Sequence, residues 1–148
     1  MLTKLYSFLI VTGNFFQPFF LLAVRLFWGW QFFKTGLGKL GDIDSIASFF
    51  GSLNIPFPQF NAYLASITET VGGLFLLLGL LSRLVTLPLI VTMIVALLTA
   101  HYDVTSMIFD DPVSVTNLPP FTFLMASLIV FVFGPGLFSM DRILKLEK

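Results

Sequence analysis

The chain has 148 residues, of which 57% are hydrophobic and only 11% are charged. A soluble domain carries about 25% charged residues because water must wet its surface, so lipid is expected to be the solvent for most of this protein. The net charge is zero, which excludes the basic field that attracts nucleic acid. Cysteine is absent and histidine occurs once, which excludes disulfides, thiol catalysis, bis-histidine haem ligation and His- or Cys-rich metal sites within the chain.

The apolar residues gather in four long stretches. A helix that spans a bilayer needs about 20 mainly apolar residues, and we expect spans near residues 15–36, 60–81, 84–102 and 119–138. The predicted fold is therefore all-α: an integral membrane bundle of four transmembrane helices, forming a single membrane domain over residues 1–148. The first fourteen residues lack a signal-peptide cleavage site, so we expect them to be retained at the membrane interface.

The loop between the first two spans carries a helical pattern. Its apolar residues recur at helical spacing: Ile43, Ile46, Ala47, Phe50 and Leu53. Eleven residues cover only about 16 Å as a helix, which is too little to cross the bilayer. We therefore predict a short interfacial helix here.

The distribution of lysine and arginine predicts the topology. With four spans, both termini and the turn at Arg83 share one side, which holds five basic residues: Lys4, Arg83, Arg142, Lys145 and Lys148. The opposite side holds two, Lys34 and Lys39. The positive-inside rule places both termini in the cytoplasm.

Two charges lie inside predicted spans, where each costs several kcal/mol unless it is paired or hydrated. Glu69 shares a helix face with small residues, which indicates that it points into the bundle. Arg25 and Glu69 lie at similar depths when they are counted from Gly36 and Phe60, the expected outer ends of their spans. We predict that they face each other. Two interpretations remain open: an ion pair that fixes helix register, and the polar floor of a ligand cavity.

Three further residues complete a candidate polar pocket. Lys39 falls on the face of Arg25 if the first helix continues that far, and Trp28 lies deeper than the usual aromatic belt. His101, near the outer end of the third span, is either a hydrogen-bonded anchor or a functional group. No catalytic triad, phosphate loop, paired-carboxylate site or metal cluster is present. The chain thus lacks a self-sufficient catalytic constellation, and its catalytic residues, if any, are unknown.

Several motifs together resemble the DoxX family of small bacterial membrane proteins. They are Arg25-x-x-x-Gly29, Gly36-x-x-Lys39, Pro56-Phe57-Pro58, Glu69-x-x-Gly72-Gly73 continuing to Gly79 and Arg83, and a polar residue, His101, ending the third span. The resemblance covers nearly the whole chain after residue 14. It implies a four-helix protein of the bacterial inner membrane. Some members look like subunits of membrane oxidoreductases that pass electrons to quinone, and another is tied to a thiol-stress complex.

Three functions are compatible with the sequence. The first is a membrane subunit of a redox or oxidative-stress complex with a pocket for quinone or another small molecule, in which Arg25, Trp28, Lys39, Glu69 and His101 are the candidate site residues. Such a protein has no intrinsic cofactor, binds quinone as a diffusible one, and has the lipid bilayer, a protein partner or a second copy of itself as partners. The alternatives are a non-catalytic scaffold that helps a partner assemble and a transporter of a small metabolite.

Overall fold

The computed structural model describes residues 2–146, and over these residues the chain is helical with no strand. This confirms the predicted all-α class. The helices, in chain order, are α1 (Leu2–Gly41), α2 (Ile43–Ser52), α3 (Pro58–Leu78), α4 (Ser82–Thr99), α5 (Tyr102–Thr105), α6 (Pro112–Thr116), α7 (Pro119–Phe133) and α8 (Met140–Ile143).

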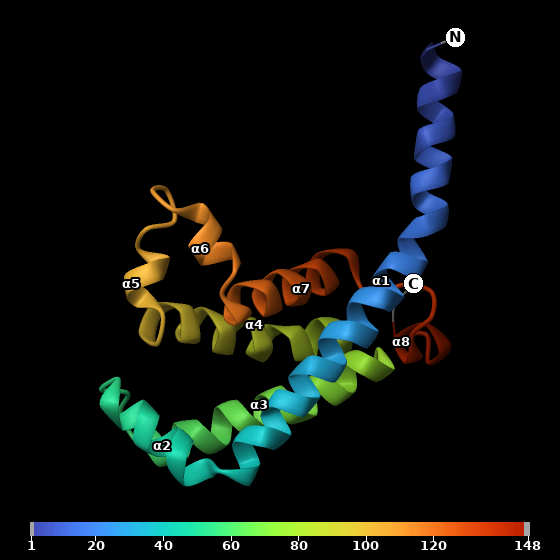
Figure 1. The fold of residues 1–148 in the computed structure, drawn as a ribbon. Coiled ribbons are helices and arrows are strands. Elements are labelled where there is room, and N and C mark those ends of the chain that lie inside the picture. Colours follow the sequence, from blue (N-terminus) through green and yellow to red (C-terminus); the bar gives the residue numbers. More distant parts are fainter. Residues whose placement is uncertain (1, 147–148) are drawn as a thin grey trace.

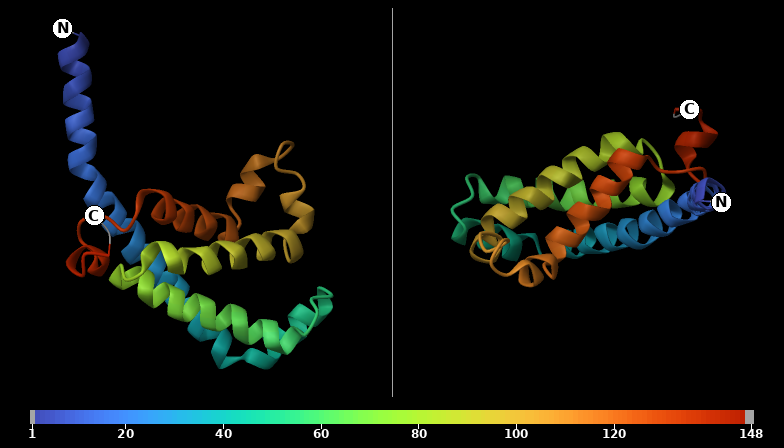
Figure 2. Two further views of the ribbon diagram at one scale, coloured as in Figure 1. Left: turned by 180° about the vertical axis from the view of Figure 1, so that it is seen from behind. Right: turned by 90° about the horizontal axis from the view of Figure 1, so that it is seen from above.

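Four long helices build the bundle in two pairs. The second half of α1 packs along α3, and α4 packs along α7 (Figure 1). The two pairs meet near α8 and diverge toward α2 and α5 (Figures 1 and 2). Apolar residues from all four helices fill the space between the pairs: Phe32, Leu76, Leu89, Met93 and Val130. These side chains hold the two pairs of helices together.

The helix α1 is much longer than the predicted span, because it also includes the first residues of the chain. It runs unbroken from Leu2 to Gly41 with Pro18 inside it. Proline removes one backbone hydrogen bond and bends a helix, and α1 changes direction part-way along (Figure 1). Residues 2–16, which we call the N-terminal arm, leave the bundle sideways (Figure 2). The predicted first span, residues 15–36, is therefore only the middle part of a longer helix.

The N-terminal arm exposes apolar side chains, among them Leu5, Phe8, Leu9 and Val11. Its placement at the membrane interface stays a prediction.

Small residues bring α1 and α3 into close contact. A Cβ atom added at Gly29 would lie 3.0 Å from the carbonyl oxygen of Gly73, and one added at Gly36 would lie 2.9 Å from that of Ser66. Only glycine allows two helix backbones to approach so closely. These contacts fix the antiparallel register, with Gly29 opposite Gly73 and Gly36 opposite Ser66 and Thr70.

Within residues 2–146, three helices are long and apolar enough to cross a membrane: α1, α3 and α4. The fourth predicted span corresponds to α7, which is apolar but has 15 residues. As a helix it covers about 22 Å, less than the ~30 Å hydrocarbon core of a typical bilayer, so the fourth crossing stays a prediction. The predicted helix between the first two spans is present as α2, and its position at the membrane surface also stays a prediction.

Candidate functional site

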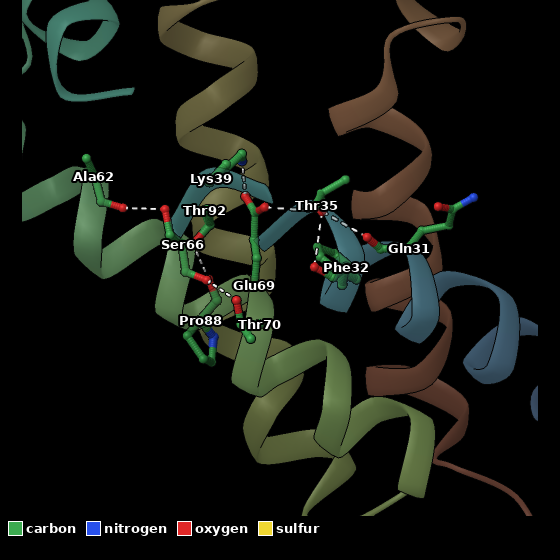
Figure 3. Close-up of polar contacts among 10 residues, drawn as sticks. All are labelled: Gln31, Phe32, Thr35, Lys39, Ala62, Ser66, Glu69, Thr70, Pro88 and Thr92. Atoms are coloured by element: carbon green, nitrogen blue, oxygen red, sulfur yellow. Dashed lines mark hydrogen bonds and ion pairs between the residues drawn. The ribbon is translucent and has the colours of Figure 1, made fainter. Parts of the chain in front are cut away.

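A buried carboxylate lies near the wide end of the bundle. Glu69, on the small-residue face of α3, is 2% exposed. Its Oε1 accepts a hydrogen bond from Lys39 Nζ at 2.5 Å, and its Oε2 accepts one from Thr35 Oγ1 at 3.4 Å. Both partners come from the last turns of α1 (Figure 3). The side chain of Lys39 is 34% exposed, so the pair joins a buried anion to a cation that reaches the surface.

The second charge inside the bundle, Arg25, has different partners. Its guanidinium donates to the carbonyl oxygens of Pro135 at 2.6 Å and Phe138 at 2.9 Å, and lies 3.5 Å from that of Leu77. The residue is 1% exposed. The segment that follows α7 is thereby tied to the middle of α1. The predicted pair between Arg25 and Glu69 is not formed.

The register of α1 and α3 explains why that prediction is wrong. The depth estimate placed Gly36 level with Phe60, whereas the glycine contacts place it level with Ser66 and Thr70. This shift moves Arg25 toward Gly79, whose added Cβ would meet the guanidinium, and leaves Glu69 opposite the end of α1. The helix faces were predicted correctly, but the depth was in error by several residues, or roughly 10–15 Å at 1.5 Å per residue.

A large cavity opens beside the Lys39–Glu69 pair. It has a volume of about 510 Å³ and lies among α2, α3, α4 and the start of α7. We call it the α2–α4 cavity. Apolar side chains form most of its wall, for example Phe49, Phe50, Leu53, Leu64 and Val95. Its polar lining comes from Lys39, Asn61, Glu69, Thr92, Thr99 and His101. An apolar chamber with a few converging polar groups is the usual form of a small-molecule site.

A smaller cavity of about 220 Å³ reaches the same ion pair from the side of α7. Phe32 and Phe123 line it, together with Thr35. Lys39 and Glu69 line both cavities. The pair therefore lies between the two apolar cavities, and a ligand in the larger cavity can contact either charged group.

The structure brings together three of the five candidate pocket residues. Lys39, Glu69 and His101 line the α2–α4 cavity. Trp28 instead packs edge-on against Phe123, with ring centroids 5.1 Å apart, and lies one layer behind the smaller cavity. Arg25 lies toward the α8 end of the bundle.

Comparison with known proteins places the chain in a family. The model of the DoxX family matches residues 20–102, which is more than half of the chain. The chain belongs to the DoxX family. The matched DoxX region holds all five candidate pocket residues, whereas Pro120, which also lines the α2–α4 cavity, lies beyond it.

Two relatives illustrate the range of similarity. The chain is 35% identical over 78 residues to a Bacillus subtilis (strain 168) protein named "Putative oxidoreductase CatD", and the match spans 53% of this chain and 57% of that protein. It is 27% identical over 129 residues to an uncharacterized protein of Haemophilus influenzae, over 84% of this chain and 83% of that one. No solved structure matches.

Two polar groups of this DoxX-family protein were not predicted from the sequence. Thr35, the second partner of Glu69, lies one turn before Lys39 on the same face, and that spacing could have indicated it. Asp141 caps α4: its carboxylate accepts the backbone N–H groups of Leu81 at 2.6 Å and Ser82 at 2.8 Å. Nothing in the sequence links Asp141 to a helix some 60 residues earlier.

Proposed function

We propose that this protein is the membrane subunit of a redox system in the bacterial inner membrane, and that its α2–α4 cavity binds a quinone. The observation that carries the proposal is the composition of the cavity: an apolar chamber of about 510 Å³ with the Lys39–Glu69 pair on its wall. A quinone has a flat apolar ring, an apolar tail and two carbonyl oxygens. The chamber suits the ring and tail, and the lysine suits a carbonyl oxygen.

The position of the cavity supports a ligand that arrives through the lipid. Leu64 of α3 and Val91 and Val95 of α4 line the cavity, are exposed and belong to helices that are apolar enough to cross a membrane. A mouth framed by such residues opens toward hydrocarbon chains rather than water. A lipid-soluble molecule is the ligand class that such a mouth admits, whereas a polar metabolite would have to cross lipid to reach it.

The polar wall supports binding of a carbonyl compound. The ammonium group of Lys39 is a strong hydrogen-bond donor and is held in place by Glu69. His101 lines the same cavity and can donate a second hydrogen bond from a ring nitrogen. Two donors that line one cavity can each serve one of the two carbonyl oxygens of a quinone, and they would also stabilise the negative charge that develops on these oxygens during reduction.

Electrons must come from a partner. The chain has no cysteine and a single histidine, so it does not offer the usual ligands of a haem or an iron–sulfur cluster. The name of the Bacillus relative, which includes the word oxidoreductase, agrees with a redox role. We therefore propose a complex in which another subunit donates the electrons and this chain holds the acceptor.

Direct binding tests the proposal. Ala65 lines the α2–α4 cavity, so Ala65→Phe should fill part of it. The matched control is Ala23→Phe, which adds the same ring at an exposed position of α1. We expect decylubiquinone to quench the tryptophan fluorescence of the purified wild-type and control proteins, and to bind Ala65→Phe at least tenfold more weakly. Equal binding by Ala65→Phe and Ala23→Phe would refute the site.

The same preparation separates the two alternative functions. Absence of quinone binding in a protein that co-purifies with one stable partner would favour the scaffold. Flux of a small metabolite into proteoliposomes, blocked by Ala65→Phe, would favour the transporter. Either result contradicts the quinone proposal.

A further inference from the structure

A second cavity system lies at the opposite end of the bundle, where α1 bends. One chamber of about 270 Å³ lies between α1, the first turn of α4 and the segment after α7. Two arginines line it, Arg83 from α4 and Arg142 from α8, together with Gln17 from α1. We call it the arginine chamber. It is distinct from the α2–α4 cavity and shares no lining residue with it.

An apolar groove adjoins the arginine chamber. This groove has a volume of about 320 Å³ and is lined by Gly13, Phe16, Gln17, Phe20, Leu21 and Phe133. Gln17, Leu21 and Phe133 line both spaces, so the groove and the chamber meet at these side chains. The result is a two-part site, lined by two arginines at one end and by Phe16, Phe20 and Phe133 at the other.

The fold holds the two arginines on the same side of the bundle. Arg83 lies in the first turn of α4, and Arg142 follows Asp141 directly. Asp141 is tied to the start of α4 by two hydrogen bonds from Leu81 and Ser82, and its own N–H donates to the carbonyl oxygen of Gly79 at 2.9 Å. Since α8 is anchored at the N-terminus of α4, Arg83 and Arg142 line the same chamber.

The charge of the chamber selects the ligand. Guanidinium groups bind phosphate with two parallel hydrogen bonds. The acidic residue nearest in sequence, Asp141, is 4% exposed and already accepts two backbone hydrogen bonds, so it is not placed to bind an ammonium group. The chamber therefore favours a phosphate headgroup whose net charge is negative over a zwitterionic headgroup, in which an ammonium group cancels the charge of the phosphate.

We infer that this two-part site binds an anionic phospholipid, with the phosphate between Arg83 and Arg142 and an acyl chain in the groove beside Phe16, Phe20 and Phe133. A free phosphate would use only the chamber, and an apolar molecule would use only the groove. A phospholipid uses both at once, and the bilayer supplies it beside the helices. Basic pockets at the ends of membrane helices bind such headgroups in general.

The test measures lipid binding to the full chain in detergent by native mass spectrometry. Phosphatidylglycerol should bind at least tenfold more tightly than phosphatidylcholine with the same acyl chains. The double variant Arg83→Gln/Arg142→Gln should abolish this preference, whereas Lys34→Gln, which removes an exposed cation of α1, should retain it. Equal binding of the two lipids to the wild type would overturn the inference.

A matched pair of glycine variants tests the groove. An added Cβ at Gly13 meets no atom within 4 Å, and neither does one at Gly38, so both sites accept a larger side chain without a backbone clash. Gly13→Leu, which fills the groove, should weaken phosphatidylglycerol binding at least fivefold, and Gly38→Leu should leave it unchanged. Equal effects of the two variants would contradict binding of the acyl chain.

A third measurement separates the lipid from a free anion. Inorganic phosphate at millimolar concentration should raise the melting temperature of the wild type less than micromolar phosphatidylglycerol does, and Gly13→Leu should lose only the lipid effect. If phosphate alone reproduces the full stabilisation, the site binds a free anion and the phospholipid is excluded. If the double arginine variant fails to fold, the Gly13 and Gly38 pair still decides between these outcomes.

Discussion

Lys39 and Glu69 form a pair whose two members are exposed to very different degrees. Glu69 is 2% exposed, whereas the side chain of Lys39 is 34% exposed. Loss of the lysine leaves a buried carboxylate without its cation, and this situation costs about 3–5 kcal/mol in soluble proteins. Loss of the carboxylate leaves an ammonium group that can turn to the surface. The two single substitutions should therefore have unequal effects.

We expect Lys39→Met to lower the free energy of unfolding by about 3 kcal/mol and Glu69→Gln by about 1 kcal/mol. The double variant should be more stable than Lys39→Met alone, because it removes the unpaired charge. Thermal unfolding in detergent measures all three variants, and Lys34→Met, an exposed lysine of the same helix, is the control. A larger loss for Glu69→Gln than for Lys39→Met would contradict this account of the pair.

Arg25 holds the segment after α7 through the branched shape of its guanidinium group. It reaches the carbonyl oxygens of Pro135 and Phe138 at once, which a single ammonium group on a shorter side chain cannot do. Arg25→Lys should therefore retain the charge but release the segment after α7. We expect a loss of about 2–4 kcal/mol in stability, with faster hydrogen exchange in residues 134–146.

The conservative exchange Lys34→Arg on the exposed face of α1 provides the comparison, and it should change neither the stability nor the exchange. Unchanged hydrogen exchange in residues 134–146 of Arg25→Lys would show that Arg25 does not hold this segment.

Helices were easier to predict from the sequence than their contacts. Apolar stretches and helical spacing placed α2, α3, α4 and α7, because these patterns are local. The predicted partner of Glu69 was wrong because the register of α1 and α3 depends on close contacts at Gly29 and Gly36, which helix length does not reveal. The partners of Arg25 are backbone carbonyls, which any residue carries, so no sequence signal marks them.

The short helix α6 is capped by a carboxylate, Asp111, that should respond to pH. Asp111 accepts hydrogen bonds from Ser114, at 2.5 Å from Oγ and 3.2 Å from the backbone N–H. These bonds lower the pKa of Asp111, and the side-chain bond is the largest cause. Because the pKa is lower in the folded state, the capping contribution is complete above the unfolded value of about 3.9 and is lost as the pH falls through the folded value.

Removal of the hydroxyl group tests this cause. Ser114→Ala should raise the pKa of Asp111 toward its ordinary value, as measured by carboxyl carbon NMR during an acid titration. Ser106→Ala is the control, since the Ser106 hydroxyl donates to the backbone carbonyl of Asp103 instead. A pKa of Asp111 that does not move in Ser114→Ala would show that the hydroxyl is not the cause.

Labelling of introduced cysteines can test the membrane topology of the chain. The five-to-two distribution of basic residues predicts that both termini lie in the cytoplasm. The chain has no cysteine, so an introduced cysteine is the single thiol that a labelling reagent can modify in it. The structure provides two exposed positions for them: Phe109, which is 95% exposed before α6, and Ile143, which is 78% exposed in α8. Ser139 would be a poor probe because it is buried.

In intact cells, an impermeant thiol reagent should label Phe109→Cys from outside and should label Ile143→Cys only after the membrane is permeabilised. Labelling of both positions from outside would place them on the same side of the membrane, so that α7, the apolar helix between them, would not cross it. The reverse pattern would invert the orientation of the whole bundle.

The contacts of Arg25 also determine the order in which the protein can mature. The carbonyl groups that receive its guanidinium belong to residues 110 and 113 positions later in the chain. Translation at about 5–20 residues per second separates the emergence of this arginine from that of its acceptors by roughly 5–20 s. During that interval a charged side chain stands in a nascent membrane helix without its final partners. A chain that stops short of Pro135 never acquires these two acceptors, so its Arg25 keeps the cost of a charge in a membrane helix without them.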